Sequence, residues 1–219
     1  MMNTIPIELN NYGASLVSQG KLKDAVATFK DALKSARDLL QSTLLQGEKS
    51  SKPSPNRTIT RPLSPGVWLS DDKFPGRSNF LVYSQPERID LSSQEKSLNS
   101  MSAEILFNLA LTHHLEALSN PPKAAFAIVI QLYEHAYRLF TQTDDGDSFL
   151  ALAVLNNLAH VHCKLQNMDD AEKICGLLWG AVLDAQNQDD SEHSLSAFEE
   201  FFTNVVHIAF KHSQQAAAA

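Results

Sequence analysis

The sequence predicts an all-α protein built from antiparallel helix pairs that stack into a short right-handed superhelix. The main evidence is a spacing of small and large residues that occurs twice, far apart in the chain. Gly13 is followed after 12, 16 and 19 residues by alanine, phenylalanine and alanine, and Ala159 at the same intervals by alanine, cysteine and leucine. Repeated helix pairs of this kind build solenoids. The composition, 43% hydrophobic and 20% charged, is that of an ordinary folded protein.

Length, charge and cysteine content exclude several classes of protein. A chain of 219 residues is long enough for one core, and we expect a single domain over residues 1–219. The net charge of −7 argues against a nucleic-acid or anionic-membrane partner, because both need clustered lysine and arginine. No apolar run is long enough for a membrane span, and residues 1–10 lack the pattern of a signal peptide. Two cysteines make no disulfide framework, so we expect a cytoplasmic location.

The first helix pair is expected over residues 5–19 and 22–46. Apolar residues recur at helical spacing in both stretches, with Ile5 and Tyr12 among those assigned to the packed side. Gly20 lies between the two stretches and permits the tight turn that ends a helix.

The composition changes after this pair. Residues 48–65 are rich in serine, proline and basic residues and contain too few apolar residues to offset the entropy of ordering, so we expect a mobile insert. Residues 66–91 are expected to be extended or to form a small β-hairpin, because 67–69 and 80–83 are short runs with β propensity. Aromatic residues in both runs predict that this segment packs on the helices.

Further helices are predicted in the second half of the chain. Val129, Tyr133 and Ala136 are assigned the packing positions of the middle pair. The last helix is expected to cap the exposed end of the stack. The expected ranges are 93–118, 122–142, 148–166, 168–187 and 190–212.

This layout resembles the tetratricopeptide repeat, a helix–turn–helix unit that stacks into a solenoid. The resemblance covers residues 6–39, 103–140 and 152–185. Segments 80–89 and 201–207 are also similar to parts of a set of algal tetratricopeptide proteins, a likeness that implies no known activity. One departure is that leucine replaces the usual early tryptophan of each unit, at Leu9, Leu106 and Leu155.

Three asparagines hold the same place in the three units. Asn11, Asn108 and Asn157 each directly precede the paired residue of the first-helix packing motif. The resemblance implies that first helices line the concave surface, where these side chains would form a row. An amide both donates and accepts hydrogen bonds, which suits the backbone of an extended peptide. The competing interpretation is that they cap turns or face water.

Histidines are the other polar candidates. Neither His113–His114 nor His160–His162 has the i, i+4 spacing of a helical zinc site, so we assign no metal ligand and no catalytic residue. His114 and His160 are placed on the groove side and are counted with the asparagines as peptide-binding candidates.

Together these features predict a non-catalytic scaffold that needs no cofactor and binds a protein or peptide on the concave first-helix face. Two alternatives stay open. In the first, the scaffold is self-occluded, with residues 66–91 in the groove. In the second, it is a helical enzyme that uses His114 or His160 with Glu104 or Glu116.

Overall fold

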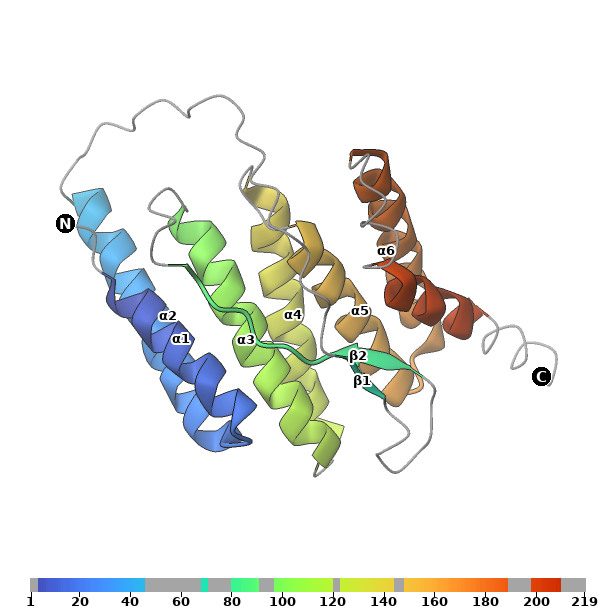
Figure 1. The fold of residues 1–219 in the computed structure, drawn as a ribbon, viewed down its shortest axis with the longest axis horizontal. Coiled ribbons are helices and arrows are strands. Elements are labelled where there is room, and N and C mark those ends of the chain that lie inside the picture. The colour runs from blue at the N-terminus through green and yellow to red at the C-terminus, as the bar shows by residue number, and fades with distance from the viewer. Residues whose placement is uncertain are drawn as a thin grey trace.

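The protein is mostly helical, as predicted, with one small two-stranded sheet among the described residues (Figure 1). A computed structural model describes residues 4–45, 68–70, 80–90, 97–119, 123–143, 148–188 and 198–209. The expected mobile insert, residues 48–65, lies outside these ranges.

Six of the helices form three consecutive pairs. Each pair packs together, and α2 and α4 also pack against the first helix of the following pair, so the pairs form a row (Figure 1). Their bounds are α1 Ile5–Ser18, α2 Leu22–Leu45, α3 Leu98–Ser119, α4 Lys123–Gln142, α5 Ser148–Lys164 and α6 Met168–Gln188. A further helix over residues 198–209, called here the C-terminal helix, lies beside α5 and α6.

Small residues allow close approach within the first pair. A Cβ atom on Gly13 would lie 2.7 Å from the Phe29 ring of α2, closer than packed carbon atoms come. Ala25, Phe29 and Ala32, the residues that the spacing rule assigned to this contact, are fully buried. The spacing therefore records a real approach of α1 to α2.

The turns of the first and third pairs are the same. Gly20 and Gln166 both have positive φ, at 73° and 62°. The following residue donates its N–H to a carbonyl of the preceding helix in each, Lys21 to Leu16 and Asn167 to His162, both at 2.9 Å. This 6→1 bond is the Schellman arrangement that ends a helix.

The first helices α3 and α5 each have two packing sides. On α3, Ile105 and Leu109 belong to a core cluster with residues of α2, the second helix of the preceding pair. Leu106 and Ala110, one position further along, pack with the cluster that contains Val129 of α4, its own second helix. α3 is thus held between two second helices, α2 and α4.

Two expectations about the helices were wrong. Ile5 and Tyr12 are 50% and 60% exposed. Tyr12 holds the position of Leu109, which packs on the preceding pair, and α1 has no preceding pair among the described residues. The third helix begins at Leu98 rather than at residue 93, because Ser97 is not helical, and residues 91–96 lie outside the described ranges.

The small sheet is an antiparallel pairing of β1, Trp68–Ser70, with β2, Leu81–Tyr83. Trp68 pairs with Tyr83, and its ring meets Phe201 of the C-terminal helix edge-on at 4.9 Å. The last helix was expected over 190–212; residues 198–209 of that range are helical and the rest lie outside the described residues.

Candidate functional site: an asparagine row and its occupant

A segment of the chain itself crosses the first helices. Residues 80–90, called here the groove segment, run from the C-terminal helix past α5 and α3 to α1 (Figure 1). The segment begins with β2 and continues without regular secondary structure. It therefore contacts a row of helices that are far apart in sequence.

Asn157 and Asn108 each hold one residue of the groove segment by both of its backbone groups. The Asn157 side chain accepts from Tyr83 N–H at 2.9 Å and donates to Tyr83 C=O at 2.8 Å. The Asn108 side chain accepts from Glu87 N–H and donates to Glu87 C=O, both at 2.7 Å. An amide can do this because it carries a donor and an acceptor side by side, like a peptide group.

The same pair of hydrogen bonds recurs at both ends of the row. Asn11 holds Ile89 by its N–H and C=O, both at 2.8 Å. Asn204 of the C-terminal helix accepts from Leu81 N–H at 2.8 Å and donates to Leu81 C=O at 2.7 Å. The structure thus brings Asn11, Asn108 and Asn157 together on one ligand, and adds a fourth asparagine to them.

Two neighbouring asparagines brace this row. Asn10 donates to Glu87 C=O at 3.1 Å and accepts from Asn108 at 2.9 Å. Asn156 donates to Leu81 C=O at 3.0 Å and accepts from Asn204 at 2.6 Å. Each carbonyl oxygen of Leu81 and Glu87 consequently accepts two amide hydrogens.

Four side chains of the groove segment are buried along with its backbone contacts. Phe80, Val82, Tyr83 and Ile89 are at most 3% exposed. Ile89 joins the core cluster of α1 and α2, whereas Phe80 and Val82 join one that contains Ala159 of α5. The segment is therefore part of the hydrophobic core of the stack.

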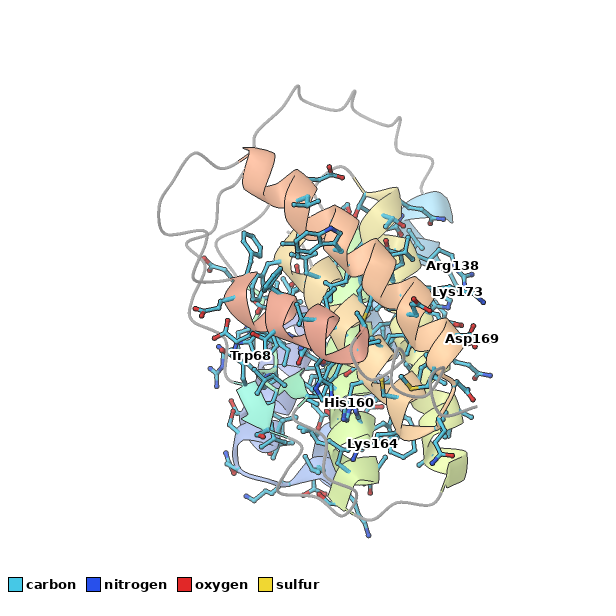
Figure 2. The ribbon with its side chains drawn as sticks, turned by 90° about the vertical axis from the view of Figure 1, so that its right-hand side faces the viewer. Trp68, Arg138, His160, Lys164, Asp169 and Lys173 are labelled. Atoms are coloured by element: carbon cyan, nitrogen blue, oxygen red, sulfur yellow. The ribbon has the colours of Figure 1, made fainter. Side chains whose placement is uncertain are left out.

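His114 and His160 lie below the groove segment and are completely buried. His114 Nε2 is 3.0 Å from His160 Nδ1, so a hydrogen on one of these atoms is shared with the other. The His160 ring also lies 5.0 Å from the ring of Phe80. Figure 2 labels His160 beside the C-terminal helix. His160 therefore touches a side chain of the groove segment, whereas the contacts of His114 are with His160, Tyr133 and Phe126.

Tyr133 links this histidine pair to the asparagine row. Its hydroxyl lies 3.3 Å from His114 Nδ1 and accepts from Asn157 at 3.1 Å. Burial raises the pKa of Tyr133 far above its usual value, and the hydrogen bond from Asn157 offsets this only in part. The hydroxyl is therefore neutral and serves as a fixed partner of both groups.

The residues considered for catalysis do not converge. Glu104 and His114 are both on α3, ten residues and so about 15 Å apart along the helix. Glu116 lies 3.8 Å from His113, and its side chain is 40% exposed. In the described parts of the chain, no group of three or more histidine, cysteine or acidic side chains is arranged to hold a metal ion.

Both cysteines are free thiols, and burial raises the pKa of Cys175 to about 12.

None of the helices within the described ranges combines the length and apolar composition that a membrane crossing requires.

Sequence reasoning did not include Asn204 among the site residues. The signal was present, since Asn204 lies two residues before Val206 just as Asn157 lies two before Ala159. It was missed because the spacing rule scores a first helix together with its second helix, and none follows here among the described residues.

Comparison with models of known families, with curated proteins and with solved structures found no match.

Proposed function

We propose that this chain is a non-catalytic protein-interaction scaffold of the tetratricopeptide type, whose concave first-helix groove is filled by its own residues 80–90. The observation that supports this proposal is the row of four asparagines, each bonded to both backbone groups of one residue in that segment. Of the occupants considered for the row, the chain's own segment is the one that the contacts favour.

The groove segment is costly to displace. Burial of its large apolar side chains stabilises the docked state by roughly 2 kcal/mol each, and Phe80, Val82, Tyr83 and Ile89 are all buried. A covalently attached ligand also acts at a high effective concentration. A partner peptide would have to exceed both effects, so we infer that partners bind outside the groove.

An added peptide with the sequence of residues 79–91 tests whether the groove is closed. We expect no saturable binding of the fluorescent peptide to the wild-type chain, because the segment already occupies every asparagine. In the Tyr83→Ser variant the attached segment loses a buried aromatic ring, so we expect the same peptide to bind at least about tenfold more tightly than to wild type.

The control variant is Ile128→Ser, which alters an apolar residue of α4 that is 51% exposed. It should behave like wild type. Saturable binding to wild type, with faster hydrogen exchange of residues 81–89, would instead show that a partner peptide exchanges with the segment. Slow exchange of these amides without added peptide is the second expected result, and it does not depend on the variants.

The enzyme alternative has weaker support. His114 and His160 are completely buried, and Phe80 lies against His160. A substrate could reach His160 only after Phe80 had moved, and His114 is enclosed by His160, Tyr133 and Phe126. An open depression at the start of α2, lined by residues 20–24 with Glu116 and Ser119, contains neither histidine.

A further inference from the structure

Hydrogen bonds join the groove segment to the buried histidine pair in an unbroken chain. Asn157, which holds both backbone groups of Tyr83, also donates to the Tyr133 hydroxyl at 3.1 Å. That hydroxyl lies 3.3 Å from His114 Nδ1, and His114 Nε2 lies 3.0 Å from His160 Nδ1. The backbone of the segment is thereby linked through side chains of α5, α4 and α3 to the second histidine.

The backbone of Tyr83 fixes the orientation of the Asn157 amide. Its N–H needs the side-chain oxygen as acceptor, and its C=O needs the nitrogen as donor. Asn156 donates to the same oxygen at 3.2 Å, which agrees with this orientation. The nitrogen has two hydrogens, of which one goes to Tyr83 and the other to Tyr133. The Tyr133 hydroxyl therefore accepts from Asn157 and donates its own hydrogen elsewhere.

The direction of the remaining hydrogen bonds follows from this orientation. The neutral Tyr133 hydroxyl donates to His114 Nδ1, so that nitrogen carries no hydrogen. A neutral imidazole has one N–H, which in His114 is then on Nε2 and points at His160 Nδ1. His160 accordingly carries its hydrogen on Nε2. The docked segment thus selects one tautomer of each histidine, with both rings neutral.

A proton added to either histidine breaks this chain. On His114 it would occupy Nδ1, to which the Tyr133 hydroxyl already donates. On His160 it would occupy Nδ1 and face the Nε2–H of His114 across 3.0 Å. Either conflict ends only when Tyr133 loses this acceptor for its hydrogen. Both rings are also completely buried, which adds the cost of placing a charge away from water.

Departure of the segment removes the restriction. Without Tyr83, the Asn157 amide can turn over and accept from the Tyr133 hydroxyl, which frees Nδ1 of His114 to bind a proton. Loss of Phe80, whose ring lies against the second histidine, also lets water reach the pair. The two facing nitrogens are too close for two cations, so the pair takes up one proton in this open state.

Other ionisable groups around the pair either oppose its protonation or lie elsewhere. Lys164 follows His160 by one helical turn on α5, and its positive charge disfavours a second cation nearby (Figure 2). His207, half-buried on the C-terminal helix, would add a charge of the same sign. The charged residues of the groove segment belong to its other end, where Glu87 is bonded to Asn108. Ionisable residues of the surrounding helices that are exposed, distant along the helix or paired elsewhere are Glu134, His135 and Arg138 on α4, Glu104 and the pair His113–Glu116 on α3, and His162 of α5 with Asp170 of α6.

We propose that the charge of the His114–His160 pair controls how firmly the asparagine row binds the groove segment, so that residues 80–83 loosen from Asn157 as the solution is acidified. This inference rests on the proposed function in one respect, which is that residues 80–90 fill the groove. A proton that binds only the open state favours opening as pH falls below the ordinary histidine pKa of about 6.5. Uptake of one proton raises the equilibrium constant for opening about 30-fold between pH 7.5 and pH 5.

Hydrogen exchange of single amides, followed by NMR from about pH 7.5 to pH 5, tests this coupling within one sample. Tyr83 N–H is bonded to Asn157 and reports on the end beside the histidines. Ile89 N–H is bonded to Asn11 on α1, a helix without histidine, and serves as the internal reference. The protection factor of Tyr83 should fall by about 10- to 30-fold relative to that of Ile89, whereas unfolding of the whole chain would lower both alike.

The variant that cannot titrate is the double substitution of His114→Gln with His160→Gln. A glutamine amide carries both an acceptor and a donor, so it can keep the bonds from Tyr133 and between the two positions without binding a proton. The ratio of the two protection factors should then be independent of pH. His135→Gln removes an exposed histidine of α4 and is the matched control, which should respond like wild type.

The histidine tautomers provide a second test that needs no substitution. Nitrogen–proton correlation spectra of wild type at about pH 7.5 should show the ring hydrogen on Nε2 of both His114 and His160, and a hydrogen on His114 Nδ1 would overturn the proposal. A ratio of Tyr83 to Ile89 that stays constant as pH falls, or that changes equally in the double variant, would overturn it as well. If both amides already lack protection at the starting pH, the groove is not filled, and the proposed function fails together with this inference.

Discussion

At the scale of single residues, the binding of the groove segment depends on one property of asparagine. Its side-chain amide presents N–H and C=O at a short, fixed distance from the helix, so it can pair with a peptide group as a neighbouring strand would. The same device occurs at Asn11, Asn108, Asn157 and Asn204. Serine offers only one hydroxyl, and glutamine would hold the segment one methylene further from the helices.

Gln166 is a residue whose backbone conformation costs stability. It has φ 62° at the turn where the first pair has Gly20, and a non-glycine residue in this region costs about 1–2 kcal/mol. Gln166→Gly removes that cost but makes the unfolded chain more flexible. We expect a net gain of about 0.5–1 kcal/mol in the free energy of unfolding, measured by urea denaturation.

The reverse substitution is the control for this prediction. Gly20→Gln should lower the free energy of unfolding by a similar amount, because it creates the strain that Gln166→Gly relieves. A Gln166→Gly variant less stable than wild type would contradict the argument.

His162 makes the stability of the third pair depend on pH. Burial lowers its pKa from the ordinary 6.5, and the smaller effects of Asp170 and Glu134 act in the opposite direction. The unfolded chain consequently binds the proton more readily, so this residue reduces stability as pH falls through 6.5. We compare the free energy of unfolding of His162→Leu with that of wild type. The value for the variant minus the value for wild type should increase as pH falls from about 7.5 to 5.

Denaturation of both proteins at each pH isolates the contribution of His162, because the contributions of all other titrating groups to the free energy of unfolding cancel in the difference. His113→Leu provides a parallel case, because burial also lowers the pKa of His113 and the residue holds the same position on α3. A difference that does not change with pH would show that the His162 ring titrates alike in the folded and unfolded chains.

At the scale of elements, the sequence predicted the parts whose signals are local. Periodicity and turn residues located the helix pairs to within a few residues, and the spacing from Gly13 identified its contact with Phe29. β-branched and aromatic runs located the two strands. Exposure of Tyr12 could not be read in this way, since it depends on whether another pair precedes α1.

The occupant of the asparagine row also could not be derived from local signals. The hydrogen bonds fix Tyr83 on Asn157 and Glu87 on Asn108, contacts that span 74 and 21 residues. Which residues pair depends on how far apart α3 and α5 lie and on where Phe80 and Ile89 find space in the core. Those distances are properties of the packed stack, and the sequence left both occupants open.

At the scale of the whole molecule, the groove segment changes how the stack holds together. In a simple solenoid each unit touches only its neighbours, so stability is close to a sum of nearest-neighbour contributions. Here one continuous segment bonds to Asn11 at one end of the row and to Asn204 at the other. Helices that do not touch are therefore connected through it.

A double-mutant cycle between Asn11→Ala and Asn204→Ala measures this connection. Asn11→Ala removes the side chain that pairs with both backbone groups of Ile89. Asn204→Ala removes the side chain that pairs with the Leu81 N–H and one of the two donors to the Leu81 C=O. Each substitution should cost roughly 1–3 kcal/mol. Once either substitution has loosened the segment, the second asparagine stabilises the fold less, so removing it costs less. We expect the double variant to be less destabilised than the sum, with a coupling of at least about 0.5 kcal/mol.

Val26→Ala on α2 and Val182→Ala on α6 form the control pair. Both residues are buried in clusters at opposite ends of the row, and neither side chain bonds to the groove segment. Their effects should be additive within about 0.3–0.5 kcal/mol, as for independent sites. Equal additivity in the two cycles would mean that the segment is bound locally at each asparagine and transmits nothing between the ends. Coupling that occurs only in the asparagine cycle would show that the groove segment joins the helix pairs into one cooperative unit.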